Sequence, residues 1–171
     1  MPGNSWLSHV RLEEQAYLRE AFQADPPDEE IVLLDPPPQV GPLTLAALTA
    51  ADYALIPVEA SPLGLKGLAT LWETLRAVRE EQNPRLRVLG IFAVRVEPHT
   101  KQGRAVLDEL RKRFPRETLQ AYIRKTVRLS EAPSWGLPIT MLDASSPGAW
   151  DYRALADEIE HRLSRRGRHG R

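Results

Sequence analysis

Two short apolar runs, separated by a stretch of helical length, dominate the hydrophobic pattern of the chain. Residues Ile31–Leu34 are all apolar and end at Asp35, and a second run covers Tyr53–Val58. Nearly continuous apolar character over so few residues is typical of a strand that is covered on both faces of a parallel sheet. The intervening LTLAALTA segment favours a short helix. The pattern therefore predicts a parallel βαβ unit.

The rest of the chain continues this alternation of strands and helices. A third apolar run, Arg87–Val94, has the character of a central strand. Ser146 is placed as an N-cap, with Pro147 at the first helical position, to open the last helix. The remaining predicted elements are helices over 12–22, 65–82 and 102–114 and short strands over 120–123 and 139–142. The expected fold class is α/β, a doubly wound and mainly parallel sheet with flanking helices.

Composition narrows the class of protein. A chain of 171 residues with 42% hydrophobic content fits one domain, expected over residues 1–164, with residues 1–10 loose and 165–171 a basic disordered tail. The formal net charge is +0, so any attraction to nucleic acid must come from local basic clusters. The chain has no cysteine, which excludes disulfides and thiol catalysis. No apolar run approaches the roughly 18 residues of a membrane span, and we expect a cytoplasmic protein.

Asp35 is the first candidate functional residue, because ligands of open parallel sheets bind at the carboxyl ends of the strands. A carboxylate in this position can hold Mg²⁺ beside a nucleotide, or it can simply cap a loop. Position alone leaves both interpretations open. The three prolines after Asp35, residues 36–38, fix φ and remove three N–H donors, so this loop is a poor phosphate cradle.

Three blocks of sequence resemble the ParA/Soj family of chromosome- and plasmid-partitioning ATPases. The first block runs from Ile31 through DPPP, LTLAAL and AADY to Ala60. The second, TVRLSEAPSWGLPI, covers Thr126–Ile139, and the third, SSPGAWDYRALADEI, covers Ser145–Ile159. The match is specific because the blocks occur in the family's order over most of the chain.

The resemblance implies a P-loop NTPase-like fold with ATP and Mg²⁺ as cofactors. Asp35 corresponds to the carboxylate that holds the magnesium shell. Arg124 and Thr126 stand where the family has the Pro and Asn of its adenine-binding turn, and these departures enrich the loop in positive charge. The residues that the resemblance assigns to the nucleotide are Asp35, Pro37, Pro38, Gly41, Arg124 and Thr126.

The family's deviant P-loop, of the form K-G-G-x-G-K-[ST]-[ST], does not occur in these 171 residues. In that motif backbone N–H groups cradle phosphates, and a lysine and a hydroxyl serve the phosphate and Mg²⁺. By resemblance, the chain lacks the N-terminal section with this loop and its central strand, and we expect no ATP hydrolysis by the chain alone. Strands facing such a gap would expose unpaired backbone groups. We therefore expect a rearranged sheet, pairing with a second copy, or a complementary partner.

A basic surface is the second candidate site. Arg128 corresponds to an arginine of the family's surface for sequence-independent DNA binding. The residues that could join it are Lys101, Arg104, Arg111, Arg113, Arg124 and Lys125. Phosphate neutralisation by such a surface is sensitive to salt and needs no base contacts. The alternative is a solvated, salt-bridged face, because Asp108 and Glu109 lie on the same predicted helix.

Two functional hypotheses follow from these residues and from the resemblance. In the first, the chain is a partition protein that acts in ATP-dependent DNA segregation, at the nucleoid, with a ParB-type centromere-binding protein. In the second, it is a non-enzymatic DNA-tethering or regulatory subunit that pairs with an intact ParA-type ATPase. A remnant with no retained activity is the third alternative.

Overall fold

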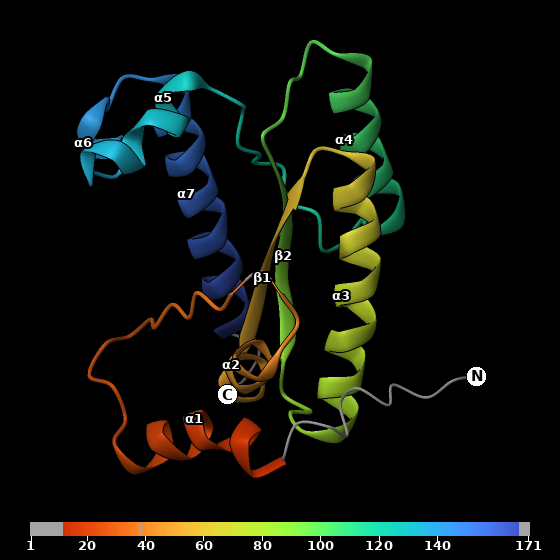
Figure 1. The fold of residues 1–171 in the computed structure, drawn as a ribbon, viewed down its shortest axis with the longest axis vertical. Helices are drawn as coiled ribbons and strands as arrows, with labels where there is room; N and C mark the ends of the chain where they lie inside the picture. Colours follow the sequence, from red (N-terminus) through yellow and green to blue (C-terminus); the bar gives the residue numbers. More distant parts are fainter. Residues whose placement is uncertain (1–11, 38, 168–171) are drawn as a thin grey trace. The chain divides into compact units, whose positions relative to one another are not determined.

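The computed structural model describes residues 12–37 and 39–167, which divide into two compact units (Figure 1). The first unit contains the described residues up to Ala54 together with Thr70–Arg87. The second contains Leu55–Ala69 and the described residues from Val88 onward. Helix α3 (Pro62–Glu81) runs through both units.

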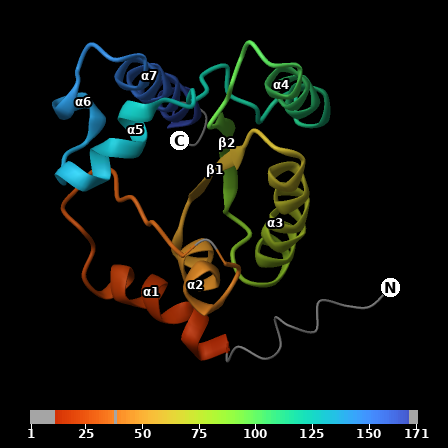
Figure 2. The same ribbon diagram turned by 45° about the horizontal axis from the view of Figure 1, so that its top comes forward.

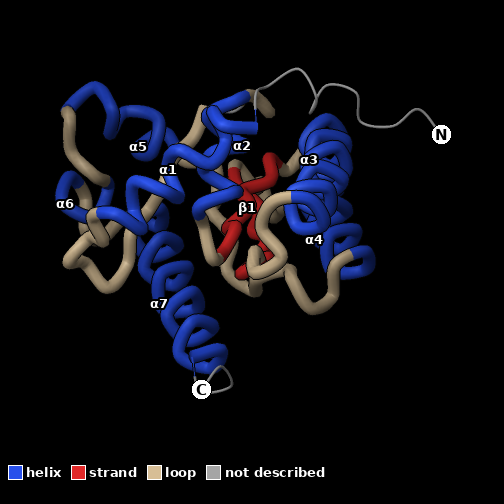
Figure 3. The backbone as a smooth tube through the Cα atoms, turned by 90° about the horizontal axis from the view of Figure 1, so that it is seen from below, coloured by secondary structure: helices blue, strands red, loops and turns tan. Residues whose placement is uncertain are grey.

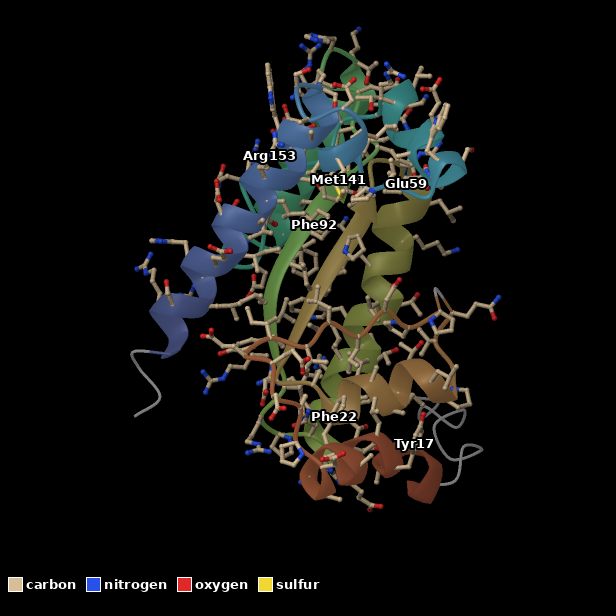
Figure 4. The ribbon with its side chains drawn as sticks, turned by 90° about the vertical axis from the view of Figure 1, so that its left-hand side faces the viewer. Tyr17, Phe22, Glu59, Phe92, Met141 and Arg153 are labelled. Atoms are coloured by element: carbon tan, nitrogen blue, oxygen red, sulfur yellow. The ribbon has the colours of Figure 1, made fainter. Side chains whose placement is uncertain are left out.

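The first unit is built from α1 (Leu12–Ala24), α2 (Pro42–Ala50) and the second part of α3. The predicted helix before the acidic DPPDEE segment is confirmed as α1, which carries Tyr17 and Phe22 (Figure 4). The amide of Asn83 donates from Nδ2 to the carbonyl oxygens of Leu48 and Ala51, at 3.0 and 2.8 Å. Asn83 thus joins the turn after α3 to the end of α2.

The predicted strand over Ile31–Leu34 is wrong. These residues have no regular secondary structure, and Ile31, Val32 and Leu33 are 56, 43 and 87% exposed. A strand forms only where a neighbouring strand takes up its backbone hydrogen bonds. No other described segment pairs with residues 31–34. The apolar pattern therefore identified a segment with strand character but not the partner that the strand requires.

The second unit contains most of a parallel two-stranded sheet, β1 (Tyr53–Glu59) and β2 (Arg87–Val94), joined through α3. The predictions for both strands are confirmed. Residues 117–125 run along the other side of β2 through parallel bridges that join Ile91 to Thr118 and Val96 to Arg124. The sheet is therefore parallel, and within the described residues β1 has β2 as its sole neighbour.

Helices α4 (Lys101–Arg113) and α7 (Pro147–Gly167) lie on opposite sides of β2 (Figures 1 and 3). On the α7 side, Phe92 of β2 packs with Leu119, Ile123 and Leu155 in a buried cluster (Figure 4). After the segment beside β2, the chain forms α5 (Val127–Glu131), the 3-10 helix η2 (Ala132–Trp135) and α6 (Ile139–Leu142) before α7 begins. Figure 2 shows these short helices close to the start of α7. The α/β class with a parallel sheet and flanking helices is confirmed.

Three smaller predictions need correction. Residues 139–142 form α6 rather than a strand, because the carbonyl of Pro138 accepts hydrogen bonds from Met141 and Leu142 and starts a helical turn. Residues 120–123 are irregular rather than a strand. Helix α7 continues to Gly167, so residues 165–167 are helical where a disordered tail was expected. The predictions for residues 1–10 and 168–171 lie outside the described residues.

None of the helices over residues 12–37 and 39–167 is long and apolar enough to cross a membrane.

Candidate functional site

Three side chains of α7 cover the outer edge of the segment that runs beside β2. Asp151 accepts from the backbone N–H of Arg124 at 2.9 Å, and Glu158 accepts from the backbone N–H groups of Gln120 and Ala121. Arg162 donates to backbone carbonyls of this segment, including that of Thr118 at 3.0 Å. Buried edge groups without partners would each cost on the order of 1 to 3 kcal/mol. The α7 side chains thus take the place of a further strand.

Arg124 lies at the end of this segment and is held by Asp151. Its Nε donates to Asp151 Oδ2 at 2.9 Å and its Nη2 to Oδ1 at 2.7 Å, a bidentate arrangement. The hydrogen bonds to Asp151 raise the pKa of Arg124 above its usual value, and the nearby carboxylate charge adds to this effect. The Asp151 side chain is 12% exposed and that of Arg124 36%. Arg124 therefore fixes the start of α7 to the end of the sheet.

Thr126 and Arg128 organise the start of the signature segment. Thr126 is the N-cap of α5, and its Oγ1 accepts from the N–H of Leu129 at 3.2 Å. Arg128 is 59% exposed and lies 3.2 Å from Glu131 and 3.4 Å from Asp143. Its charge is thus balanced by two carboxylates, one of them on the far side of the α5–α6 segment.

The remaining basic candidates divide into paired and unpaired cations. Lys125 pairs with Glu97, Arg111 with Asp108 and Arg113 with Glu109. Lys101 and Arg104 are exposed in the first turns of α4, and no carboxylate of the described residues lies within salt-bridge distance of either. Both expected arrangements therefore occur, a salt-bridged face and two cations that remain available to a phosphate.

The Asp35 loop lies in the first unit. Asp35 is exposed, and its carboxylate has no hydrogen bond or ion pair with any described residue. Thr44 of α2 ties the loop back by donating from Oγ1 to the carbonyl of Gln39 at 2.7 Å. Gly41 is the N-cap of α2 with φ −143°, an ordinary extended conformation, so its role here does not depend on glycine's freedom. Pro38 lies outside the described residues.

The sequence-predicted residues thus fall into two groups. Asp35, Pro37 and Gly41 belong to the first unit, and Arg124, Thr126 and the basic residues belong to the second. Within the second unit the structure brings Arg124, Lys125 and Thr126 together beside α7. Among the described residues, no group of three His, Cys, Asp or Glu side chains is arranged to hold a metal ion.

Sequence reasoning missed the edge-covering residues of α7. Asp151, Glu158 and Arg162 are spaced by seven and four residues, which places them on one helical face. That spacing was available from the sequence, but the backbone groups they bind were not. It also missed Arg95, which has a positive φ of 55° just after β2 and lies 3.8 Å from Glu59.

Comparison with solved structures defines the class of protein. Cobyrinic acid a,c-diamide synthase from Mycobacterium smegmatis, solved with ADP and magnesium, is 28% identical with a TM-score of 0.71, over 94% of this chain and 57% of that chain. The fold is also shared with apo McdA from Cyanothece, with a TM-score of 0.74 and 19% identity over 88% of this chain and 59% of that chain. The cell division ATPase MinD from Pyrococcus furiosus has the same fold, with a TM-score of 0.68 and 20% identity over 86% of this chain and 58% of that chain. The chain therefore has the α/β fold of the P-loop NTPases.

Sequence comparison then gives the family. A family model described as an AAA domain matches residues 7–88. Soj, a chromosome-partitioning ATPase of Thermus thermophilus, is 43% identical over 146 residues, which are 85% of this chain and 58% of that protein. The sporulation initiation inhibitor protein Soj of Bacillus subtilis is 36% identical over 148 residues, 86% and 58% of the two chains. The resemblance to the ParA/Soj family that the motifs indicated is therefore confirmed, and the chain spans a little over half the length of these relatives.

Proposed function

We propose that this chain is a ParA/Soj-type partitioning protein, which acts in DNA segregation with duplex DNA and a ParB-type centromere-binding protein in the cytoplasm, at the nucleoid. The observation that carries the proposal is the 43% identity to the chromosome-partitioning ATPase Soj of Thermus thermophilus over 85% of the chain. The available cations at the start of α4 are consistent with a role on DNA.

The described residues fit one half of a magnesium-nucleotide site. Mg²⁺ is usually bound through one or two carboxylates, with waters and phosphate oxygens completing its shell, and the exposed, unpartnered Asp35 is such a carboxylate. When bound, Mg²⁺ would neutralise phosphate charge beside this residue. The phosphate cradle does not fit, because Pro36, Pro37 and Pro42 supply no N–H donors around the loop.

The two residues that the resemblance assigns to adenine are already engaged within the second unit. Arg124 is engaged by Asp151, and the hydroxyl of Thr126 caps α5. We therefore derive no step of ATP hydrolysis from these residues. This mismatch favours the second candidate function, a DNA-tethering or regulatory subunit that pairs with an intact ParA-type ATPase.

DNA binding is proposed to depend on Lys101 and Arg104, with Arg128, Lys125, Arg124, Arg111 and Arg113 as the wider basic surface. A cation already paired with a carboxylate gains less from a phosphate, because the existing pair must be given up first. Each phosphate contact contributes about 0.9 to the slope of log K against log salt concentration. The two unpaired cations should therefore account for a measurable share of that slope.

The DNA proposal is tested by fluorescence anisotropy on two duplexes of equal length and unrelated sequence, over a series of salt concentrations. We expect the double variant Lys101→Glu/Arg104→Glu to weaken binding to both duplexes equally and to reduce the salt slope by about 2. Arg85→Glu is the matched control, since Arg85 is exposed and lies outside the candidate surface. Equal losses in the control, or a loss confined to one sequence, would contradict the assignment.

The nucleotide proposal is tested by calorimetric titration of the chain with Mg-ATP. Binding that is lost in Asp35→Asn but kept in Asp28→Asn, an exposed carboxylate elsewhere in the first unit, would support the ATPase function. Absence of binding, together with a changed ATPase rate when the chain is mixed with an intact ParA-type protein, would support the regulatory function. If neither binding nor a rate effect is observed, both candidates fail.

A further inference from the structure

Arg95 has a backbone conformation that arginine rarely adopts. The residue directly follows β2, and its φ of 55° is the one positive value among the described non-glycine residues. At a positive φ the Cβ of an L-residue crowds the backbone, so such positions usually carry glycine. Strain of this kind persists only where the surrounding structure imposes it, and it occurs mostly at functional sites. The fold must therefore hold Arg95 in this conformation.

A β-bulge at the end of β2 imposes the conformation. In a regular parallel ladder, a residue donates to one residue of the neighbouring strand and accepts from another that lies two positions further on. Ile123 instead donates to the carbonyl of Ala93 at 2.9 Å and accepts from the N–H of Val96 at 3.0 Å, three positions further on. One extra residue is thus inserted after Ala93. The bulge turns Val96 into the core, where it is 1% exposed, and leaves the side chain of Arg95 66% exposed.

The contact that Arg95 makes with Glu59 does not account for an arginine at this position. Nε of Arg95 lies 3.8 Å from Oε1 of Glu59, which ends β1 and is labelled in Figure 4. That distance is too long for a hydrogen bond. Both side chains are more than half exposed, and ion pairs so open to water contribute little to stability. Glycine would adopt the same φ without strain, so the arginine makes the fold less stable than it could be.

The position and the chemistry of Arg95 indicate what its guanidinium binds. Ligands of open parallel sheets bind beyond the carboxyl ends of the strands, and Arg95 lies at the carboxyl end of β2. A guanidinium donates to phosphate oxygens in a bidentate geometry. The same connection leads into α4, where Lys101 and Arg104 have no carboxylate of the described residues within salt-bridge distance. Residues 95–104 thus carry three cations, none of which is held firmly by a described carboxylate.

We propose that Arg95 is a phosphate-binding residue that contacts the backbone of duplex DNA beside Lys101 and Arg104, an inference that rests on the proposed function. A DNA backbone is favoured because several cations follow one another along this connection, as a ligand with many phosphates requires. Such a contact positions the protein on DNA without reading its sequence. Arg95 gives up only a long, exposed pair with Glu59 when it binds a phosphate.

The strained backbone allows a test in which stability and binding change in opposite directions. Arg95→Gly removes both the charge and the strain. We expect a higher urea midpoint, because glycine adopts a positive φ readily, and a salt slope for duplex DNA that is smaller by about 0.9, the contribution of one phosphate contact. Arg95→Lys keeps the charge and the strain. Its midpoint and its slope should therefore stay close to those of the unmodified chain.

Arg76→Gly is the matched control. Arg76 lies on α3 in the first unit, is 60% exposed and is loosely paired with Glu73 and Glu80, at 3.7 and 3.9 Å. The same substitution there should leave the salt slope unchanged and should lower the urea midpoint, because glycine weakens the interior of a helix. Similar shifts for Arg76→Gly and Arg95→Gly in either measurement would overturn the proposal.

The role of Arg95 can fail separately from the function on which it rests. A higher midpoint with an unchanged slope in Arg95→Gly, while Lys101→Glu/Arg104→Glu still reduces the slope, would refute the role of Arg95 and leave DNA binding in place. No binding of duplex DNA by the unmodified chain would refute both. Loss of Mg-ATP binding in Arg95→Gly, measured by calorimetry, with an unchanged DNA slope would assign the phosphate to a nucleotide and would also overturn the proposal.

Discussion

The pair formed by Arg124 and Asp151 gives a quantitative prediction about what fixes α7 to the end of the sheet. We consider the variants Arg124→Ala and Asp151→Ala and the double variant. Asp151→Ala removes the acceptor for three donors, namely the backbone N–H, Nε and Nη2 of Arg124. Arg124→Ala leaves the backbone N–H bonded to Asp151. The loss of unfolding free energy should therefore be larger for Asp151→Ala.

The magnitude follows from exposure and bond type. A hydrogen bond to a charged group contributes about 1.5 to 3 kcal/mol when it is shielded from water. Asp151 is nearly buried but Arg124 is one-third exposed, so water replaces part of the interaction. We expect a coupling free energy of about 2 kcal/mol between the two side chains, and an additional cost of about 1 kcal/mol in Asp151→Ala for the backbone donor left without a partner.

The contribution should not depend on pH near neutrality. Hydrogen bonding to Asp151 raises the pKa of Arg124. A raised pKa in the folded state gives stability that is fully present below the pKa of the unfolded arginine and is lost only as the pH rises through the folded value. Both values lie in strong alkali, so the effect of Arg124 on stability should be constant across the neutral range.

The assay is urea unfolding followed by far-ultraviolet circular dichroism, with all four chains of the cycle measured under the same conditions. The control cycle uses Lys125 and Glu97, a pair whose two side chains are about half exposed, for which we expect at most about 0.5 kcal/mol. A coupling energy for Arg124 and Asp151 no larger than that of this control would refute the reasoning that burial and bidentate geometry make this pair strong.

Further predictions concern four other positions, all measured by thermal or urea unfolding. Gly64→Ala should destabilise the chain by about 2 kcal/mol, because a Cβ at Gly64 would lie 2.2 Å from the carbonyl oxygen of Glu59. Gly67→Ala should stabilise the chain by about 0.5 kcal/mol, because a Cβ at Gly67 would have no atom within 4 Å. Similar effects of the two alanines would contradict the close approach. Arg162→Met keeps the apolar stem but removes the donors to the backbone carbonyls beside β2, so we expect a loss of about 2 kcal/mol, and no loss would mean that water replaces the guanidinium. Asn83→Ala should cost about 2 kcal/mol, since two carbonyl oxygens lose a donor, and an unchanged midpoint would exclude a role for this amide.

The fold could be predicted from the sequence wherever its signals are local. The runs over Tyr53–Val58 and Arg87–Val94 are nearly continuous in apolar character and form β1 and β2, and the Ser146-Pro147 pair marks the start of α7 as predicted. Ser146 Oγ accepts from the N–H of Ala149 at 3.2 Å, which is the capping bond that the pattern implied. Such signals depend on residues within one turn or strand of each other.

The failures have a common physical cause. Ile31–Leu34 has the composition of a strand, but a strand is stabilised by a neighbour that can be distant in the chain, and the pattern says nothing about that neighbour. Residues 139–142 are a mostly apolar segment of four residues, too short for periodicity to separate strand from helix. Pro138 is the N-cap of a helical turn, so these residues form α6 rather than a strand.

The candidate site residues also divide into those that the local sequence identifies and those that only the fold identifies. Asp35 was identified from its place after an apolar run, and the structure leaves its carboxylate exposed and without a hydrogen bond or ion pair to any described residue. The partner of Arg124 could not be inferred, because Asp151 is 27 residues away and only the fold brings the two together. The sequence shows which basic residues are present. Which of them are neutralised by a nearby carboxylate depends on the tertiary structure.

The way α7 covers one margin of the sheet has a consequence for assembly. Glu158 and Arg162 occupy the donors and acceptors that a further strand would need on that side. A strand from another chain therefore cannot extend the sheet on this side unless α7 first moves away.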